Sequence, residues 1–402
     1  MTVSSAARRV LSGAAFLALA AAALTACGSP QQAATGGEGD ATPYQVGLIY
    51  SQSGVLATYG KQYAEGFRAG LTYATKGSNK VGSHPIVVTE VDDTGDPAKA
   101  VSAAKDLIGK GYKVLAGSTS SGVGLQVAPI AAQNKVLFIS GPAATDGLTG
   151  ANRYTFRSGR QSYQDVRTAK SFLGDPAGKK VLVFAQDSAF GQANVAAVKA
   201  VIGGAGATAS QILVPADAKE FTTFAKQALD AKPDMLFVAW AGTTAPTMWQ
   251  ALDQQGVLAS TQVVTGLDIR ASWPTFGAAG AKIAFLSHYF DGASNTAEYT
   301  ALKQAVAGGK VDLFHPDGFT AAQMIVHALE ASGSDVDAMI KALEGWSFAG
   351  VKGQLTIRAE DHAVLQPMYQ AKLTGSGTDY TAELVKALTP DETAPPVTGF
   401  KG

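Results

Sequence analysis

Strand-like and helix-like segments alternate along this chain from residue 44 onward, and this alternation constrains the fold more than any other feature. Short apolar runs at 46–50, 114–116 and 136–139 have the length of buried strands. Longer segments such as 59–75 and 162–173 carry apolar residues at helical spacing. Because helices of this length separate the strands, we predict parallel sheets with helices on both faces, which is an α/β architecture.

The number of alternating segments predicts two lobes rather than one. The chain has 402 residues, 46% of them hydrophobic, which is enough for two cores. The alternation restarts after Tyr154-Thr155-Phe156, and one sheet does not comfortably hold so many strands. We therefore predict two doubly wound lobes. Near the end, the sequence predicts a short helix at 381–388 and a loose segment after it.

The first 27 residues have the pattern of a secretion signal. Arg8 and Arg9 precede an apolar segment at 10–24, which is shorter than the roughly 20 residues that span a membrane. The segment that follows, Leu24-Thr25-Ala26-Cys27, resembles the lipobox of bacterial lipoproteins, which implies lipidation of Cys27. The alternative is an ordinary signal peptide with an incidental cysteine. Residues 28–43 have little to bury and predict a flexible tether.

Charge and motif content exclude several classes of function. The 32 basic and 32 acidic side chains balance, whereas a nucleic-acid-binding surface needs a basic excess. The single cysteine excludes an intramolecular disulfide and a cysteine metal cluster. The sequence lacks H-E-x-x-H, G-x-S-x-G and G-x-x-x-x-G-K-[ST] motifs. We therefore expect no nucleic-acid partner, no metal, no cofactor and no catalysis, and we predict binding in a cleft between the lobes.

Two loops of small residues predict where that binding occurs. The runs at 114–116 and 136–139 end in Gly-Ser-Thr-Ser-Ser-Gly (117–122) and Ser-Gly-Pro-Ala-Ala-Thr (140–145). Ligands of open parallel sheets bind beyond the carboxyl ends of strands, and the start of a helix adds free N–H donors. Such a place suits a carboxylate. The alternative is that these residues are ordinary helix caps and turns.

Eight segments together resemble the type I periplasmic binding proteins, similar to the leucine/isoleucine/valine-binding proteins that feed ABC transporters. They are VGLIYSQSGVLATYG, VDDTGDPAKAV, AGSTSSG, FISGPAATD, FRSGRQSYQD, VFAQDSAFG, DMLFVAWAG and HPDGFTAAQMIVHALE. The resemblance runs from about residue 44 to 373 and rests on the order and spacing of the segments.

The resemblance implies two Rossmann-like lobes joined by three crossovers, with a ligand held at the hinge. The crossovers are expected near 158–160, 288–291 and 346–350. The expected first lobe is then 44–158 plus 290–345, the expected second lobe is 159–289 plus 346–390, and 391–402 form a loose tail.

The resemblance also implies the binding residues of an amino acid. The α-carboxylate is expected at Ser121, with Ser120 beside it, and at Thr145, with the backbone of Ala143 and Ala144. The ammonium is expected at Asp268, for which a helix cap is the alternative. The cavity-lining aromatic residues are expected to be Tyr59, Phe190, Trp240 and Phe319, although packing under a loop is an alternative for Tyr59.

Three departures from the relatives concern the ligand. Phe190 and Phe319 stand where the leucine-type relatives have tyrosine. Arg160 lies in a segment where those relatives have an aspartate that contacts the ammonium, so Arg160 is a candidate to receive a second carboxylate or an aromatic acid. A salt bridge at the surface or hinge is the alternative for Arg160.

The two resemblances together imply a monomeric receptor of an ABC importer, lipid-anchored at the outer face of a bacterial plasma membrane. It delivers a branched-chain or other hydrophobic amino acid to a membrane permease. A small organic or aromatic carboxylate is the second candidate ligand. A ligand-sensing ectodomain that partners a membrane signalling protein is the alternative function.

Overall fold

The computed structural model describes residues 41–377 and 379–401. The predicted signal peptide, Cys27 and the tether up to residue 40 lie outside these residues. Within the described part of the chain, no helix has both the length and the apolar character needed to cross a membrane.

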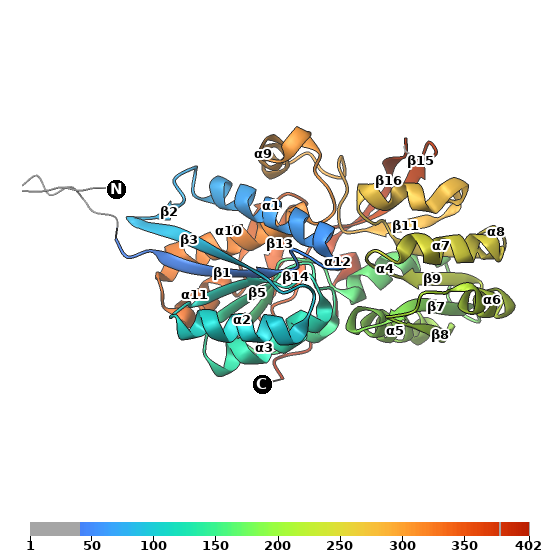
Figure 1. Ribbon diagram of the computed structural model, residues 1–402, viewed down its shortest axis with the longest axis horizontal. Coiled ribbons are helices and arrows are strands. Elements are labelled where there is room, and N and C mark those ends of the chain that lie inside the picture. Colours follow the sequence, from blue (N-terminus) through green and yellow to red (C-terminus); the bar gives the residue numbers. More distant parts are fainter. Residues whose placement is uncertain (1–40, 378, 402) are drawn as a thin grey trace, which may run out of the picture. The chain divides into compact units, whose positions relative to one another are not determined.

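The first lobe is built on a six-stranded sheet in the order β2-β3-β1-β4-β5-β6 (Figure 1). Its strands are β1 (Tyr44–Tyr50), β2 (Lys80–Val81), β3 (His84–Asp92), β4 (Val114–Gly117), β5 (Leu137–Ser140) and β6 (Thr155–Arg157). All pairs are parallel except the edge pair β2–β3.

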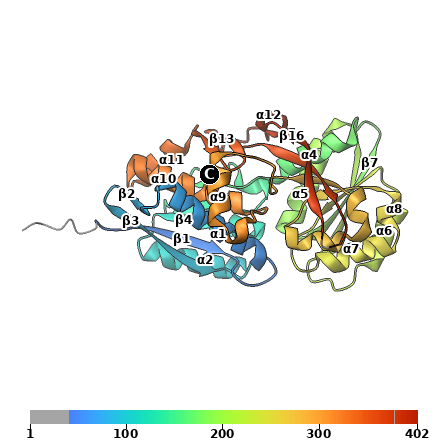
Figure 2. The same cartoon turned by 90° about the horizontal axis from the view of Figure 1, so that it is seen from above.

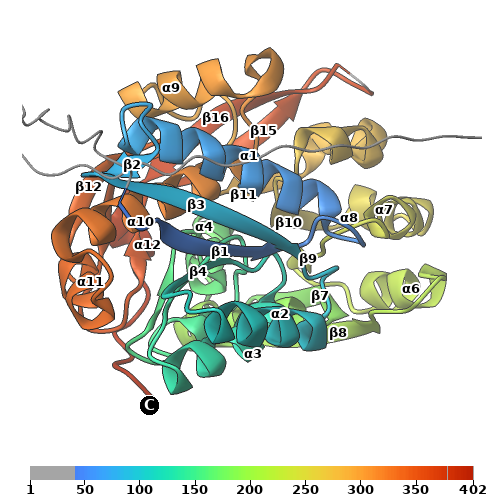
Figure 3. The ribbon, with the colours of Figure 1, turned by 60° about the vertical axis from the view of Figure 1, so that its left-hand side comes forward.

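Helices cover both faces of this sheet, because alternate residues of each buried strand point to opposite sides. In β1, Val46 and Leu48 join the core under three helices, whereas Ile49 joins the core under two others. The first three are α1 (Ala57–Ala74), α10 (His315–Ser332) and α11 (Val336–Leu343), and the other two are α2 (Pro97–Gly109) and α3 (Ser121–Gln133). Figure 3 shows α1 on one side of the sheet and α2 and α3 on the other.

The second lobe is built on a seven-stranded sheet in the order β16-β15-β11-β10-β9-β7-β8. Its strands are β7 (Lys180–Asp187), β8 (Thr208–Pro215), β9 (Met235–Ala239), β10 (Gln262–Gly266), β11 (Ala284–Ser287), β15 (Met368–Thr374) and β16 (Thr381–Leu388). The helices α4 (Ser162–Leu173) and α5 (Ala189–Val201) pack on one face, and α6 (Thr222–Asp230) and α7 (Ala245–Gln254) on the other. The predicted fold class of two doubly wound α/β lobes is confirmed.

The chain passes from the first lobe to the second between β6 and α4, and returns after β11 to α9 (Ala297–Ala305), which packs against α1. The expected third crossover near 346–350 is wrong. Strands β12 (Ser347–Gly350), β13 (Gly353–Ile357) and β14 (Val364–Leu365) form a small antiparallel sheet whose apolar side chains join the first lobe's core. The third crossover therefore follows β14, and residues 346–365 belong to the first lobe.

The helix predicted at 381–388 is instead the strand β16, which pairs antiparallel with β15 across a bulge at Gln370/Ala371. Leu384, Val385 and Leu388 have a spacing that fits one face of a helix, so the sequence pattern was ambiguous. Residues 381–388 form a strand because the edge of β15 offers backbone hydrogen-bond partners. The formation of a strand depends on neighbouring strands more than the formation of a helix depends on its surroundings.

The tail predicted to be loose is bound to the first lobe. After β16, the short helix α12 (Pro390–Thr393) begins with a capping box between Thr389 and Glu392. Arg358 then donates to the carbonyl oxygens of Pro395 (2.7 Å) and Pro396 (3.1 Å), and Asp361 Oδ2 accepts from the N–H of Thr398 (3.1 Å). Figure 2 shows α12 near α4 and β16. The tail is therefore a fourth connection between the lobes.

Deleting residues 394–402 is expected to lower the free energy of unfolding by about 1–3 kcal/mol, because Arg358 and Asp361 lose hydrogen-bond partners. Chemical denaturation followed by circular dichroism measures this change. E360Q, at an exposed neighbour, is the matched control and should leave stability unchanged. An unchanged stability of the truncated chain would show that the tail contributes nothing.

Candidate functional site

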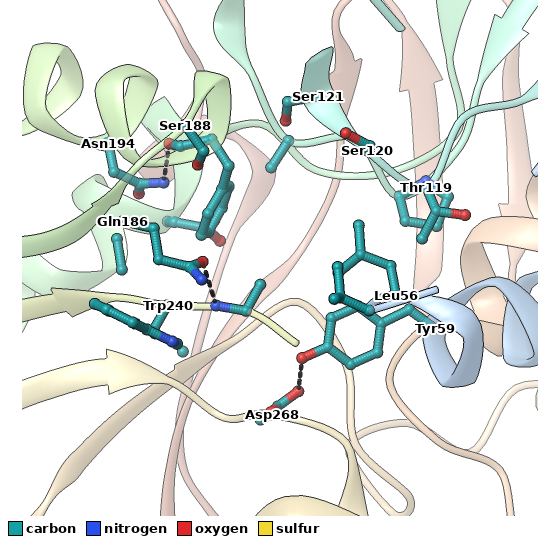
Figure 4. A pocket seen from close by; sticks show the side chains of 18 of the residues that line it. Leu56, Tyr59, Thr119, Ser120, Ser121, Gln186, Ser188, Asn194, Trp240 and Asp268 are labelled. Atoms are coloured by element: carbon teal, nitrogen blue, oxygen red, sulfur yellow. Dashed lines mark hydrogen bonds between the residues drawn. The ribbon is translucent and has the colours of Figure 1, made fainter. Parts of the chain in front are cut away.

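A cavity of about 420 Å³ lies between the two lobes. The first lobe contributes the start of α1, the loop between β4 and α3, and the segment before α10. The second lobe contributes the loops that follow β7, β9, β10 and β11. These loops follow the carboxyl ends of parallel strands, where ligands of such sheets bind. Figure 4 shows side chains of both lobes around the cavity.

One end of the cavity is lined by hydroxyl groups at the start of α3. Ser120 occupies the N-cap position of α3, yet its side chain makes no capping hydrogen bond, which leaves its hydroxyl available. Ser121 Oγ accepts from the N–H of Thr145 at 3.2 Å, which ties the two small-residue loops together. The turn before them needs Gly117, because a Cβ there would lie 1.9 Å from the carbonyl oxygen of Ile49. The free N–H groups of the first helical turn make this end suitable for an anion.

The acidic side of the cavity is formed by Asp268, which comes after β10. Its Oδ1 accepts from the Tyr59 hydroxyl at 2.8 Å and from the N–H of Ile269 at 2.7 Å. Tyr59 also accepts from the N–H of Gly242 at 3.2 Å, so this hydroxyl from the first lobe meets two elements of the second. Burial raises the pKa of Asp268 and the pKa of Tyr59. Figure 4 shows the Tyr59–Asp268 contact.

Aromatic and aliphatic side chains form the rest of the lining. Trp240 is fixed by a stacked contact with Phe184, by an edge contact with Phe221, and by donation from Nε1 to Thr244 Oγ1 at 3.0 Å. Phe190, Leu56 and Phe314 add apolar surface. The cavity thus combines a hydroxyl end, an acid and an apolar wall, which is the composition of a small-molecule site.

Arg160 lies at the hinge side of the cavity. Its Nε contacts Asp165 Oδ2 at 3.2 Å, and its Nη1 donates to the carbonyl oxygen of Pro142 at 2.8 Å. Among the described residues, Arg160 Nη2 has no hydrogen-bond partner. Burial raises the pKa of Asp165 to about 6, although Arg160 opposes this shift.

Behind Arg160, a buried polar network joins the segments that connect the lobes. Lys352 Nζ donates to Asp317 Oδ1 at 2.9 Å and to Gln366 Oε1 at 2.8 Å. His288 Nε2 faces the other oxygen of Asp317 at 3.4 Å. Burial lowers the pKa of His288 to about 3. Burial alone would raise the pKa of Asp317, but Lys352 and His288 hold it below its usual range.

Eight of the eleven predicted binding residues line this one cavity. They are Tyr59, Ser120, Ser121, Ala144, Arg160, Phe190, Trp240 and Asp268. The other three do not. Ala143 is buried in the core of the first lobe, Thr145 caps the turn Asp146–Leu148 through Gly147 N (3.3 Å), and Phe319 packs beneath α1 against Tyr73. Phe319 is wrong because it lies within α10, whose first turns are buried against α1.

Other residues that the sequence did not indicate also line the cavity. Gln186 and Ser188 lie at the end of β7, so the strand-end argument used for the first lobe would have found them. Asp165 and Asn194 lie on helices, His288 in a crossover and Phe314 before a helix, and no local pattern marks them. Within the described residues, no group of three or more His, Cys, Asp or Glu residues could hold a metal ion.

His288 predicts a pH dependence of stability. Its pKa is about 3 in the folded protein and about 6.5 when unfolded, so the unfolded chain gains a proton as the pH falls below 6.5. This group should cost about 1–2 kcal/mol of stability between pH 6.5 and pH 5. H288Q should therefore lose less stability than the wild type over that range in denaturant titrations. H84Q is the control, and equal losses in H288Q and wild type would contradict the prediction.

Comparison with known proteins gives consistent matches. The model of the periplasmic binding protein family matches residues 43–379. The Leu/Ile/Val-binding protein BraC3 of Rhizobium johnstonii is 25% identical over 307 residues, covering 74% of this chain and 83% of the relative. This family match confirms the resemblance inferred from the eight sequence segments.

Solved structures agree with the family match. The structure of an ABC-type branched-chain amino acid transporter protein from Rhodopseudomonas palustris has a TM-score of 0.73 at 31% identity, covering 89% of this chain and all of that chain. A solute-binding protein of an ABC transporter from R. palustris, solved with 4-hydroxybenzoate, has a TM-score of 0.79. It is 22% identical, with 87% and 97% of the two chains covered, and supports the fold alone.

Proposed function

The chain belongs to the periplasmic binding protein family, and we propose that it is the receptor of an ABC importer that binds a hydrophobic amino acid between its lobes. The observation that carries this proposal is the pairing, in one cavity, of the α3 N-terminus with Asp268. An amino acid carries an anion and a cation on the same carbon. A cavity that offers donors on one lobe and an acid on the other complements both charges.

The carboxylate would bind at the start of α3. Ser120 and Ser121 supply hydroxyl groups there, and the helix start supplies N–H donors and a partial positive charge. Ala144 lines the same end. This end needs no basic side chain to hold an anion.

The ammonium would bind at Asp268. This side chain is partly exposed to the cavity, and Tyr59 and Ile269 both donate to its Oδ1, while the Ser272 side chain is a further hydrogen-bond partner of the carboxylate. An ammonium group would bind the carboxylate from the side that faces the cavity. Trp240, Phe190 and Leu56 would surround an apolar side chain.

A carboxylate without an ammonium group is the second candidate ligand. The position of Arg160 in the cavity lining favours it. Its Nη2 lacks a partner among the described residues, and a guanidinium binds planar carboxylates well. The 4-hydroxybenzoate bound by the R. palustris protein is a ligand of this kind. In this alternative, Arg160 and the apolar wall hold the ligand, and Asp268 serves only to hold Tyr59.

Delivery and location complete the proposal. Ligand contacts on both lobes would favour a closed arrangement, which then docks on a membrane permease. A lipid on Cys27 would anchor a monomer at the outer face of the plasma membrane. A ligand-sensing ectodomain would use the same closure, but its partner would be a signalling protein.

D268N tests the proposed ammonium site. The amide can still accept from the Tyr59 hydroxyl, but it removes the charge that an ammonium would meet. Binding of leucine or phenylalanine, measured by calorimetry, should weaken by about 1.5–3 kcal/mol. D253N, at an exposed position of α7, is the control. Unchanged amino-acid affinity in D268N, with loss of carboxylate binding in R160Q, would favour the second candidate instead.

A further inference from the structure

Beside the cavity, the two lobes touch along a seam that includes residues with no place in the ligand site. We define this seam by Leu56, Tyr59, Gln62, Asp312, Leu313 and Phe314 of the first lobe, with Ala241, Gly242, Ile269 and Arg270 of the second. Six of these form one apolar cluster, in which four are buried and two are partly buried; the buried ones are Tyr59, Ile269, Leu313 and Phe314, and the others are Leu56 and Ala241. At Gly242, a Cβ would lie 3.0 Å from the carbonyl oxygen of Val55, so the backbones of the two lobes approach closely there.

Asp312 bridges this seam with a single carboxylate oxygen. Its Oδ2 accepts from Gln62 Nε2 of α1 at 2.8 Å and from the N–H of Arg270, on the second lobe, at 3.0 Å. Its Oδ1 accepts from the N–H of Leu313 at 2.9 Å. Gln62 in turn accepts from the N–H of Phe314 at 3.2 Å. The first lobe therefore fixes the carboxylate in a position from which it reaches the second lobe.

This bridge lies outside the binding cavity. Asp312, Gln62 and Arg270 are not among the cavity-lining residues, whereas Tyr59 and Asp268 are. A change at Tyr59 or Asp268 would alter both the contact between the lobes and the chemistry seen by a ligand. Asp312 itself does not line the cavity, so a change there would reach a ligand only indirectly, through the contact between the lobes, the loop at Leu313 and Phe314, and the negative charge that adds to burial in raising the pKa of Asp268.

The energetic consequence follows from the coupling of closure to binding. When the lobes separate, the Arg270 N–H exchanges the charged acceptor for water, so the bridge favours the closed arrangement. The observed affinity of a ligand is its affinity for the closed arrangement multiplied by the population of that arrangement. Weakening the bridge therefore reduces the affinity for every ligand by the same factor.

We propose that Asp312 is a positioning residue that sets the closure equilibrium of the lobes, and thereby the affinity of the cavity, without contacting the ligand. This inference rests on the proposed function only in requiring that the cavity binds some small molecule on closure. It does not depend on whether that molecule is an amino acid or a carboxylate.

D312A in the full chain tests the proposal by calorimetry and stopped-flow binding. Leucine, phenylalanine and benzoate are the probes. Each probe that binds the wild type should bind D312A about tenfold more weakly, because one charge-assisted hydrogen bond is lost. The change should lie mainly in the dissociation rate. D335A is the matched control, because Asp335 caps α11 within the first lobe. Unchanged affinity, or a loss confined to ligands with an ammonium group, would overturn the proposal.

A second measurement separates this inference from the proposed function. Small-angle X-ray scattering without ligand should give D312A a larger radius of gyration than wild type and D335A, because the unbridged lobes open more. If no probe binds the wild type, the proposed function fails and this comparison still decides the role of Asp312. Equal radii would overturn that role. D312N keeps the shape of the side chain and replaces D312A in both measurements if D312A does not fold.

Discussion

The buried ion pair of Asp317 and Lys352 is the interaction on which the relation of the two lobes depends. Asp317 lies in the first turn of α10 of the first lobe, faces His288 of the second crossover, and leaves no room for a Cβ at Gly159 of the first crossover. Lys352 connects this carboxylate to Gln366 in the third crossover. A buried charge without its partner costs about 3–5 kcal/mol, so the three segments are held in one arrangement around this pair.

The arrangement of the connecting segments determines which residues line the cavity. Arg160 and His288 belong to the connecting segments and form the hinge side of the cavity, while the Ser120–Ser121 loop and Asp268 lie on separate lobes. A ligand with both charges would therefore bind most tightly when the lobes are together, which is the physical basis of ligand-driven closure in this account.

Much of this architecture follows from the sequence, because buried parallel strands are continuous apolar runs and their carboxyl ends locate the site. Ser121, Trp240 and Asp268, predicted from those strand ends and from the family resemblance, line the cavity. The sequence did not predict the strand β16 or the position of the third crossover. Both depend on strand pairing with segments that are distant in the sequence. Thr145 and Phe319 do not line the cavity. The direction of a loop side chain such as Thr145 leaves no periodic signal, and residues 315–326 of α10 are buried on all sides, so periodicity does not show which way Phe319 points.

The most direct test of the central claim compares one amino acid with its deaminated counterpart. Calorimetric titration of the full chain with leucine and with 4-methylpentanoate changes only the ammonium group, while the apolar side chain and the carboxylate stay the same. We expect leucine to bind, and 4-methylpentanoate to bind at least about tenfold more weakly, because Asp268 then has no cation to meet. Equal binding of the two, or binding of 4-methylpentanoate alone, would contradict it.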